Sequence, residues 1–248
     1  MPLSAVVPST KPGRNGRPET RMEALIRIER ALQVWLDEAR HSELKAQLAT
    51  AESLYAKTLS YFPQSKRGNY RLARFYYDNG RIQEGLQRLR QHGMLLDVPR
   101  FSQPPVIDGR LDDEVWSQAA EADTFYQLSF EHVAAVVSPL KSRLYLGYTD
   151  EALYIGFYGY DEKPEDLMVS AKNFDDNVWW EDVIEIFMDA NFDHVSYAQV
   201  GITSVPVVAD KWYPDGFSAT VGNTDWSAGF EVATHVGQDY WSIEYGDH

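Results

Sequence analysis

The chain has 248 residues, of which 44% are hydrophobic and 24% are charged, and its formal net charge at pH 7 is −14. This length allows one large domain or two ordinary ones, each with a sizeable core. The acidic balance makes nucleic acid an unsuitable partner, and the absence of cysteine excludes disulfides, thiolate catalysis and cysteine-based zinc sites.

Charge divides the chain near Pro99. Residues 1–100 contain 17 Lys and Arg against 10 Asp and Glu, whereas residues 101–248 contain 6 against 27. Two regions of opposite charge indicate two units with different surfaces. The basic residues of the first unit are spread along its expected helices, so we expect neither unit to bind nucleic acid.

Residues 1–20 are rich in Pro, Gly, Ser and Thr and lack the apolar segment of a signal peptide. This composition predicts a disordered leader. The sequence contains no run of about 18 apolar residues, the length that a membrane-spanning helix needs. We therefore expect no membrane span, and either a cytoplasmic protein or a fragment whose export signal lies outside this sequence.

Residues 21–98 carry apolar residues at helical spacing, beginning with Leu25, Ile28, Leu32 and Leu36. Pro and Gly interrupt the pattern only at short turns. The sequence therefore predicts a helical first unit.

Within this unit, Ala51 and Gly85 stand 34 residues apart, and we expect these small residues where two helices cross closely. The segment AESLYAKTLSYFP (51–63) resembles the second helix of a tetratricopeptide repeat, and NYRLARFYYDNGRIQEGLQRL (69–89) resembles the repeat that follows. An ordinary helical hairpin is the alternative. Because one or two repeats bury little surface, we expect this unit to pack on the second unit or on a protein partner.

Residues 99–248 change to short segments rich in Val, Ile, Tyr and Phe, separated by turn-forming residues. We expect strands at 142–149, 152–160, 183–189, 197–203, 230–236 and 240–245. Short strands without long helical segments between them predict an antiparallel β-sandwich or barrel. Alternation along 183–188 places Ile184, Ile186 and Met188 on one face and Glu185 on the other.

Three motifs follow one another in this second unit. PPVIDGRLDDEVWSQA (104–119) has the pattern Pro-x-Ile-Asp-Gly-x-x-Asp-x-x-x-Trp-x-x-Ala, LYLGYTDEALYIGFYGYD (144–161) forms paired strands around an acidic turn, and WWEDVIEIFMD (179–189) has the pattern Trp-x-x-Asp-x-x-Glu-x-Phe-x-Asp. In this order the motifs resemble family 9 carbohydrate-binding modules and the wider group of DOMON-like domains. The resemblance implies an antiparallel β-sandwich of the family 9 type over residues 99–248, so the expected fold is the helical unit followed by this sandwich.

The resemblance also implies one or two further strands after His248, so we expect a C-terminally truncated sandwich with an unpaired edge. Trp116 is expected in the core of the sandwich. Asp108 and Gly109 form a turn dipeptide, because glycine adopts positive φ without steric cost and the carboxylate can cap the turn.

In sugar-binding members of the family, an aromatic residue six positions before a strand glutamate stacks on the sugar, and the glutamate bonds its hydroxyls. The resemblance carries these roles to Trp179 and Glu185, with Gln199 and Thr203 at polar positions of the neighbouring strand. A sugar offers C–H groups to an aromatic ring and hydroxyls to polar side chains, so the chemistry agrees. Gly201 departs from the family, whose binding members often carry an arginine there, and one donor is missing.

Trp180 follows Trp179 directly, so an extended backbone would send the two rings to opposite sides. We assign Trp179 to the binding platform and Trp180 to the core or rim. The alternative is that both rings only cover the edge of the sandwich.

Acidic residues crowd the loops at 161–166, 175–176 and 189–193, and relatives of the family often hold a structural calcium. The resemblance implies such an ion, without assigning its ligands. Neighbouring Glu181 and Asp182 point away from each other on one strand, whereas a glycosidase needs carboxylates about 5 to 10 Å apart across the scissile bond. We therefore expect no catalysis within this chain.

Three functions follow from these features. The first is a non-catalytic module that binds mono- or oligosaccharides or polysaccharide ends and directs a glycoside hydrolase, acting on O-glycosyl bonds, to polysaccharide during carbohydrate catabolism. The resemblance implies an extracellular or periplasmic location. The second is a structural or interaction scaffold whose sandwich has lost sugar binding. The third is a haem domain, as in relatives that bind haem through methionine, although no histidine pairs convincingly with Met168 or Met188.

Overall fold

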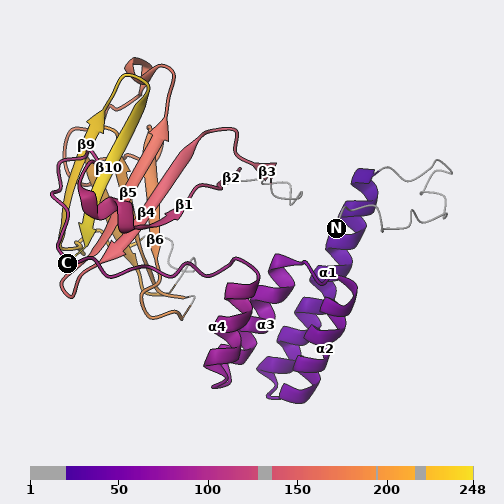
Figure 1. Ribbon diagram of the computed structural model, residues 1–248. Coiled ribbons are helices and arrows are strands. Elements are labelled where there is room, and N and C mark those ends of the chain that lie inside the picture. Colours follow the sequence, from indigo (N-terminus) through magenta and orange to yellow (C-terminus); the bar gives the residue numbers. More distant parts are fainter. Residues whose placement is uncertain (1–20, 128–135, 194, 216–221, 248) are drawn as a thin grey trace. The chain divides into compact units, whose positions relative to one another are not determined.

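The computed structural model describes residues 21–127, 136–193, 195–215 and 222–247 (Figure 1). The leader expected at residues 1–20 lies outside these ranges. Within them, the chain divides into two compact units, and the boundary falls between Leu96 and Asp97.

The described part of the first unit consists of four helices, α1 to α4, arranged as two helical hairpins (Figure 1). Their bounds are α1 Arg21–Leu44, α2 Leu48–Tyr61, α3 Lys66–Asp78 and α4 Ile82–Gln91. The apolar residues at helical spacing form one core in which Leu32 and Leu36 of α1 pack with Tyr55 of α2 and Phe75 of α3. None of the helices in the described ranges combines the length and the apolar character needed to cross a membrane.

Both small residues of the 34-residue period lie at close contacts. Ala51 is fully buried in the core of the unit. A Cβ added to Gly85 would lie 2.6 Å from the carbonyl oxygen of Ala73, so α4 approaches α3 too closely for any side chain. Tetratricopeptide repeats and ordinary hairpins both contain such contacts, and the repeat assignment stays a prediction.

The second unit is built from antiparallel strands. Their bounds are β1 Ala120–Ala122, β2 Tyr126–Gln127, β3 Val136–Val137, β4 Ser142–Tyr148, β5 Leu153–Tyr160, β6 Val183–Met188, β7 Tyr197–Thr203, β8 Val208–Tyr213, β9 Phe230–Val236 and β10 Tyr240–Asp247, with short 3₁₀ helices η2 at Glu114–Gln118 and η3 at Pro164–Asp166. All six strands expected from the sequence are confirmed. The alternation of apolar residues did not predict β1, β2, β3 and β8.

The larger sheet has the order β1-β4-β5-β10-β9 (Figure 1). The smaller sheet has the order β6-β7-β8, and β2 pairs with β3 in a separate two-stranded sheet. One core contains Ile155 and Ile243 of the larger sheet together with Val200 and Ile202 of the smaller. Side chains of both inner faces therefore pack together, which makes the unit a β-sandwich. The predicted sharing of one face by Ile184, Ile186 and Met188 is confirmed, since all three pack against this core.

β10 lies inside the larger sheet, between β5 and β9. It pairs with β5 from Tyr240 opposite Tyr160 to Asp247 opposite Leu153. The expected strands after His248 stay a prediction.

The first motif wraps a buried carboxylate of β10. Glu244 is 0% exposed, and its two oxygens accept hydrogen bonds from the backbone N–H groups of Asp108 (2.8 Å), Gly109 (2.7 Å) and Leu111 (3.3 Å) and from Nε1 of Trp116 (2.7 Å). Trp116 is buried, as predicted. These four donors satisfy a carboxylate that would otherwise be costly to bury. We call this arrangement the Glu244 clasp.

Residues 99–118 cover one half of the outer face of the larger sheet. The ring of Phe101 occupies the position that a side chain on Gly147 would need, and Leu111 and Trp116 do the same at Gly156. Glycines on β4 and β5 thus let large side chains sit directly on the sheet backbone.

A second buried carboxylate lies on β8. Asp210 is fully buried, and its Oδ2 accepts a hydrogen bond of 2.9 Å from the backbone N–H of Ala228. Its Oδ1 has no hydrogen-bond partner among the described residues. Burial raises the pKa of Asp210, and the nearby charge of Asp175 raises that pKa further.

Asp210→Asn is expected to raise the free energy of unfolding at pH 7 by about 1 kcal/mol, because it removes a buried, incompletely bonded charge. A carboxyl group with a raised pKa destabilises the fold once it ionises, so the wild type loses stability as pH rises from the unfolded pKa through the folded one. The gain should therefore vanish near pH 3.5. Urea unfolding at both pH values measures it, with exposed Asp225→Asn as the control. A gain that is equal at both pH values would contradict this explanation.

Candidate functional site

The outer face of the smaller sheet carries the residues singled out by the third motif. Residues directly opposite each other in antiparallel strands share a face. From the strand register, the outward rows are Glu185–Gly201–Ala209, Phe187–Gln199–Lys211 and Tyr197–Tyr213. The opposite face of these strands packs into the core of the sandwich.

Trp179 lies over this face from the turn that precedes β6. A Cβ added to Gly201 would lie 2.8 Å from Cζ3 of Trp179 and 3.0 Å from a methyl of Val178. The indole is half-buried, and Nζ of Lys211 lies 5.0 Å from its ring centroid. Glycine at position 201 therefore leaves the space that the tryptophan occupies, and the ring is held in place by the sheet below it.

Polar side chains lie next to this ring. Nε2 of Gln199 donates a hydrogen bond of 2.8 Å to Oε2 of Glu185, and Lys211 stands opposite Gln199 on β8. Glu185 is exposed and Gln199 is half-buried. The structure thus brings three of the four predicted residues, Trp179, Glu185 and Gln199, to one surface.

Lys211 is a member of this surface that the sequence analysis missed. It lies on β8, which was not predicted as a strand. Had VADKWY been read as a strand, its alternation would have placed Lys211 on one face with Ala209 and Tyr213. That Gln199 shares this face follows from the pairing of β8 with β7. Its ammonium group offers this surface a cationic hydrogen-bond donor, which Gly201 lacks.

Thr203, the fourth predicted residue, stands opposite Val183 on the same side of β7 as Gly201, but it is closed off from this surface. It is 0% exposed, and its hydroxyl is bonded within the β7–β8 turn to the carbonyl oxygens of Val205 and Val207. A hydroxyl committed to a buried turn cannot bond an external sugar, so we leave Thr203 out of the candidate site.

The two tryptophans occupy a turn, so the extended backbone considered for them is absent. Trp180 is 84% exposed, which places it outside the core. Of the two locations considered for Trp180, the rim is therefore the one that the structure allows.

An aromatic row continues the face beyond the polar residues. The rings of Phe187 and Tyr197 lie 5.8 Å apart, and those of Tyr197 and Tyr213 stack at 4.6 Å with an interplanar angle of 16°. Rings packed in this way support one another across the strands.

Glu181 and Asp182 anchor the loop before β6. Oε1 of Glu181 accepts hydrogen bonds from the hydroxyl and the N–H of Ser170 and from the N–H of Ala171, while Asp182 accepts from the N–H of Met168. The hydroxyl of Ser170 lowers the pKa of Glu181. These contacts give the adjacent acids a structural role.

The acidic loop at 189–193 is also bonded internally. Asp193 accepts hydrogen bonds from the backbone of Val195 and Ser196 and from the hydroxyl of Ser196, and these bonds lower its pKa to about 2, the bond from Val195 contributing most. Within the ranges that the structure describes, no group of three or more acidic or histidine side chains is arranged to hold a metal ion. The calcium implied by the resemblance stays a prediction.

The two methionines considered for haem stand at different ends of β6. Met188 is the last residue of the strand and packs against the core. The backbone N–H of Met168 donates a hydrogen bond to Asp182, which lies just before the strand, and Met168 is largely exposed. The structure does not bring them together.

No protein-family model and no curated protein matches the chain. Solved structures with a similar arrangement include a family 9 carbohydrate-binding module from Caldicellulosiruptor kristjanssonii in complex with cellotriose (18% identity, TM-score 0.43) and one from the same organism in complex with glucose (19% identity, TM-score 0.42). Each alignment covers 60% of this chain, and 66% and 67% of those chains, respectively. The chain thus spans about two thirds of their length and resembles them only distantly.

Proposed function

We propose that the second unit binds carbohydrate without cleaving it, on the outer face of β6, β7 and β8. The observation that carries this proposal is the indole of Trp179 seated over Gly201, beside the hydrogen-bonded pair of Glu185 and Gln199. A rigid ring next to an acceptor, an amide and the ammonium of Lys211 offers what a pyranose needs.

The chemistry assigns each group a task. The indole contacts the C–H face of the sugar, and its position over the sheet keeps the entropy lost on binding small. Glu185 accepts hydrogen bonds from hydroxyls, whereas Gln199 and Lys211 donate them. The bond between Glu185 and Gln199 fixes both side chains before the sugar arrives.

Trp179→Ala is expected to weaken binding about 30-fold, which corresponds to about 2 kcal/mol for a lost stacking contact. Isothermal titration calorimetry measures this directly and does not depend on tryptophan emission. The titrations begin with glucose and cellotriose, the ligands named for the two similar structures, and continue with neutral xylo-, manno- and arabino-oligosaccharides.

Trp180→Ala is the matched control, because its exposed neighbouring ring contributes no platform and should leave affinity within twofold. Glu185→Gln, which keeps the shape and removes the charge, should weaken binding about tenfold. If folded Trp179→Ala bound sugar as well as wild type, the ring would serve only to cover the sheet, and the scaffold hypothesis would replace this one.

The proposal extends to a targeting role. A non-catalytic module with an attached helical unit can hold a partner enzyme near its polysaccharide, and the first unit, basic where the second is acidic, offers a separate surface for that partner. An extracellular or periplasmic location accords with this role.

A further inference from the structure

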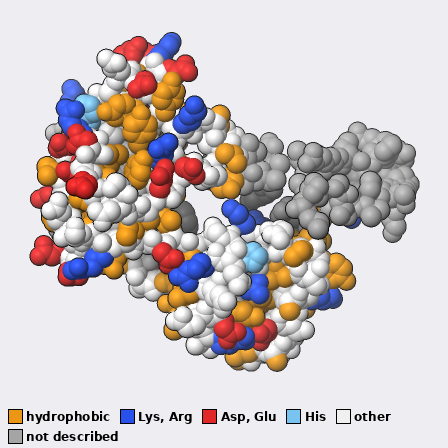
Figure 2. Space-filling model, in the orientation of Figure 1, with side chains coloured by type: hydrophobic (Ala, Val, Ile, Leu, Met, Phe, Trp, Pro, Cys, Tyr) orange, Lys and Arg blue, Asp and Glu red, His pale blue; other side chains and the backbone are white. Residues whose placement is uncertain are grey.

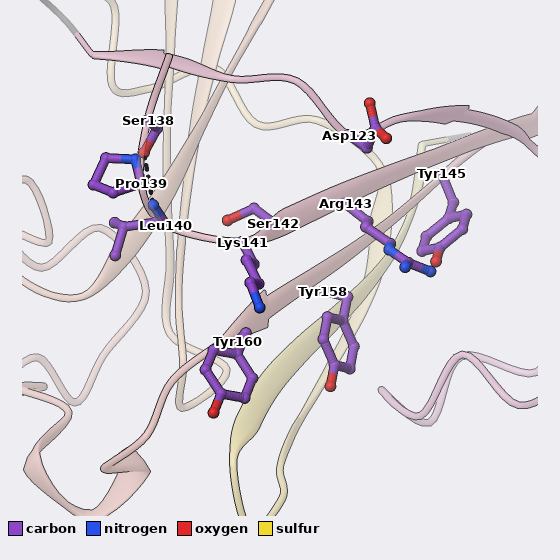
Figure 3. Close-up of a pocket in the computed structure, with 10 residues that line it drawn as sticks. All are labelled: Asp123, Ser138, Pro139, Leu140, Lys141, Ser142, Arg143, Tyr145, Tyr158 and Tyr160. Atoms are coloured by element: carbon purple, nitrogen blue, oxygen red, sulfur yellow. Dashed lines mark hydrogen bonds between the residues drawn. The ribbon is translucent and has the colours of Figure 1, made fainter. Parts of the chain in front are cut away.

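A pocket of about 510 Å³ lies on the outer face of the larger sheet (Figure 3). Trp179 lies on the outer face of the other sheet. It is formed by β4, β5 and the loop that leads into β4. Tyr145, Tyr158 and Tyr160 line it together with Lys141 and Arg143. The volume falls within the range of small-molecule sites, about 300 to 1,000 Å³.

This pocket occupies the half of the face that residues 99–118 leave uncovered. Phe101 and Trp116 cover the sheet at Gly147 and Gly156, and beyond them Tyr158 and Tyr160 point outward from β5. Figure 2 shows hydrophobic side chains, a class that includes tyrosine, gathered over this end of the sheet with basic side chains beside them. Tyr160 is 38% exposed.

The tyrosines belong to a row of rings that crosses several strands. Tyr158 of β5 stacks on Tyr240 of β10 at 4.7 Å with an interplanar angle of 18°, and Tyr240 lies 5.9 Å from His235 of β9. Neighbouring strands are about 4.8 Å apart, so each ring braces the next. Rings fixed by the sheet and by one another lose little freedom when a ligand stacks on them.

Two basic side chains border the rings. Arg143 stands opposite Tyr158 in the strand register. Its guanidinium is hydrogen-bonded to Tyr145, and its ion pair with Glu121 is long, at 3.5 Å, and exposed. That ion pair is weak, and a guanidinium has five N–H donors, so donors remain for a ligand. Nζ of Lys141 lies 5.7 Å from the ring centroid of Tyr160, and Lys141 has no ion pair among the described residues.

The charges around the pocket decide which ligand suits it. The positive charges of Lys141 and Arg143 are balanced by the carboxylates of Glu121, which pairs with Arg143, and Asp123, which lines the pocket. Residues 101–248 as a whole contain 27 acidic and 6 basic residues. A polyanion would therefore gain little locally and would be repelled by the rest of the unit. A neutral polyhydroxyl ligand can use donors and acceptors of both signs.

We infer that this pocket is a second carbohydrate-binding site, which takes a neutral oligosaccharide across Tyr158 and Tyr160, with Arg143 and Lys141 donating to its hydroxyls. The inference rests on the proposed function for the class of ligand only, because its residues lie on the other sheet. One sandwich would then hold glycans on both outer faces.

Calorimetric titration of the full chain with the same neutral oligosaccharides tests the inference. Wild type should bind two equivalents of sugar. Tyr158→Ala and Tyr160→Ala should each weaken the pocket site at least tenfold and leave the one equivalent bound at Trp179. Adding Trp179→Ala to either variant should remove that remaining equivalent. Tyr148→Ala is the matched control, since this tyrosine of β4 is 39% exposed and does not line the pocket. It should bind as wild type does.

The outcomes separate the two proposals. Suppose that wild type binds one equivalent, that Trp179→Ala abolishes this binding, and that both tyrosine variants retain it. That result would overturn the second site and leave the proposed function standing. If the one equivalent were instead lost in Tyr160→Ala and retained in Trp179→Ala, the pocket site would stand and the site proposed at Trp179 would be overturned. Tighter binding of trigalacturonic acid than of neutral trisaccharides at the tyrosine site would overturn the ligand class.

Discussion

Replacing Glu244 with alanine is expected to lower the free energy of unfolding of the β unit by about 4 kcal/mol, because a buried, charged hydrogen-bonding group is removed and its partners remain. Four N–H donors, three from the backbone at Asp108, Gly109 and Leu111 and one from Trp116, would lose their acceptor. The covering segment 99–118 would keep its apolar contacts, the backbone hydrogen bonds that join Pro99 and Phe101 to Tyr148, and the bond from the hydroxyl of Ser242 to the carbonyl of Gly109.

Urea unfolding followed by near-ultraviolet circular dichroism measures this loss, since Trp116 is among the rings whose environment changes. Glu231→Ala is the control, because Glu231 is an exposed glutamate on β9, opposite Gly246 of β10. It should change stability by less than about 0.5 kcal/mol. A Glu244→Ala protein within 1 kcal/mol of wild type would mean that the clasp contributes little.

Gly109→Ala is expected to cost about 3 kcal/mol or more, for two reasons that add. Gly109 has a φ of +87°, which disfavours a side chain by about 1 to 2 kcal/mol. A Cβ there would also lie 2.5 Å from the carbonyl carbon of Thr234, and the backbone would have to shift. That shift would lengthen the bonds from Gly109 N–H to Glu244 and from the hydroxyl of Ser242 to the carbonyl of Gly109, now 2.7 and 2.6 Å.

Gly80→Ala separates the two causes. Gly80 has a similar φ of +79°, but nothing lies within 4 Å of the position its Cβ would take. Its substitution should cost only the conformational part, about 1 to 2 kcal/mol, in the unfolding of the helical unit. Equal losses for both substitutions would show that the contact with Thr234 is unimportant.

Periodicity predicted the regular elements well where one face of a strand is buried and the other is not. The alternation in VIEIFM predicted both the strand β6 and the shared face of Ile184 and Ile186, which packs into the core. β8 was missed because Asp210 stands at an inward position and Lys211 beside it at an outward one, which removes the contrast between apolar and polar residues. β2 and β3 are two residues long, too short for any period to register.

The candidate site was predicted from the resemblance to family 9 modules, which picked out Trp179, Glu185 and Gln199 of this surface. Trp179 and Glu185 are six positions apart, and both lie on the outer face of the smaller sheet. The burial of Thr203 depends on the geometry of the β7–β8 turn, and the role of Lys211 depends on pairing with Gln199. The Glu244 clasp could not be predicted from a local pattern either, because Glu244 lies 136 residues beyond Asp108.

The interior position of β10 bears on the order in which the protein acquires its structure as it is synthesised. The helical hairpins join neighbours in sequence, so the first unit can fold while the rest of the chain is still being made. β5 can pair with β4 at once, but its other edge stays unpaired until Tyr240 to Asp247 have been made, because β10 pairs there, and β9 waits for the same strand. During that interval one edge of β5 offers its backbone hydrogen-bonding groups to any other strand, so a nascent chain that ends before Tyr240 is expected to associate more readily than the finished one.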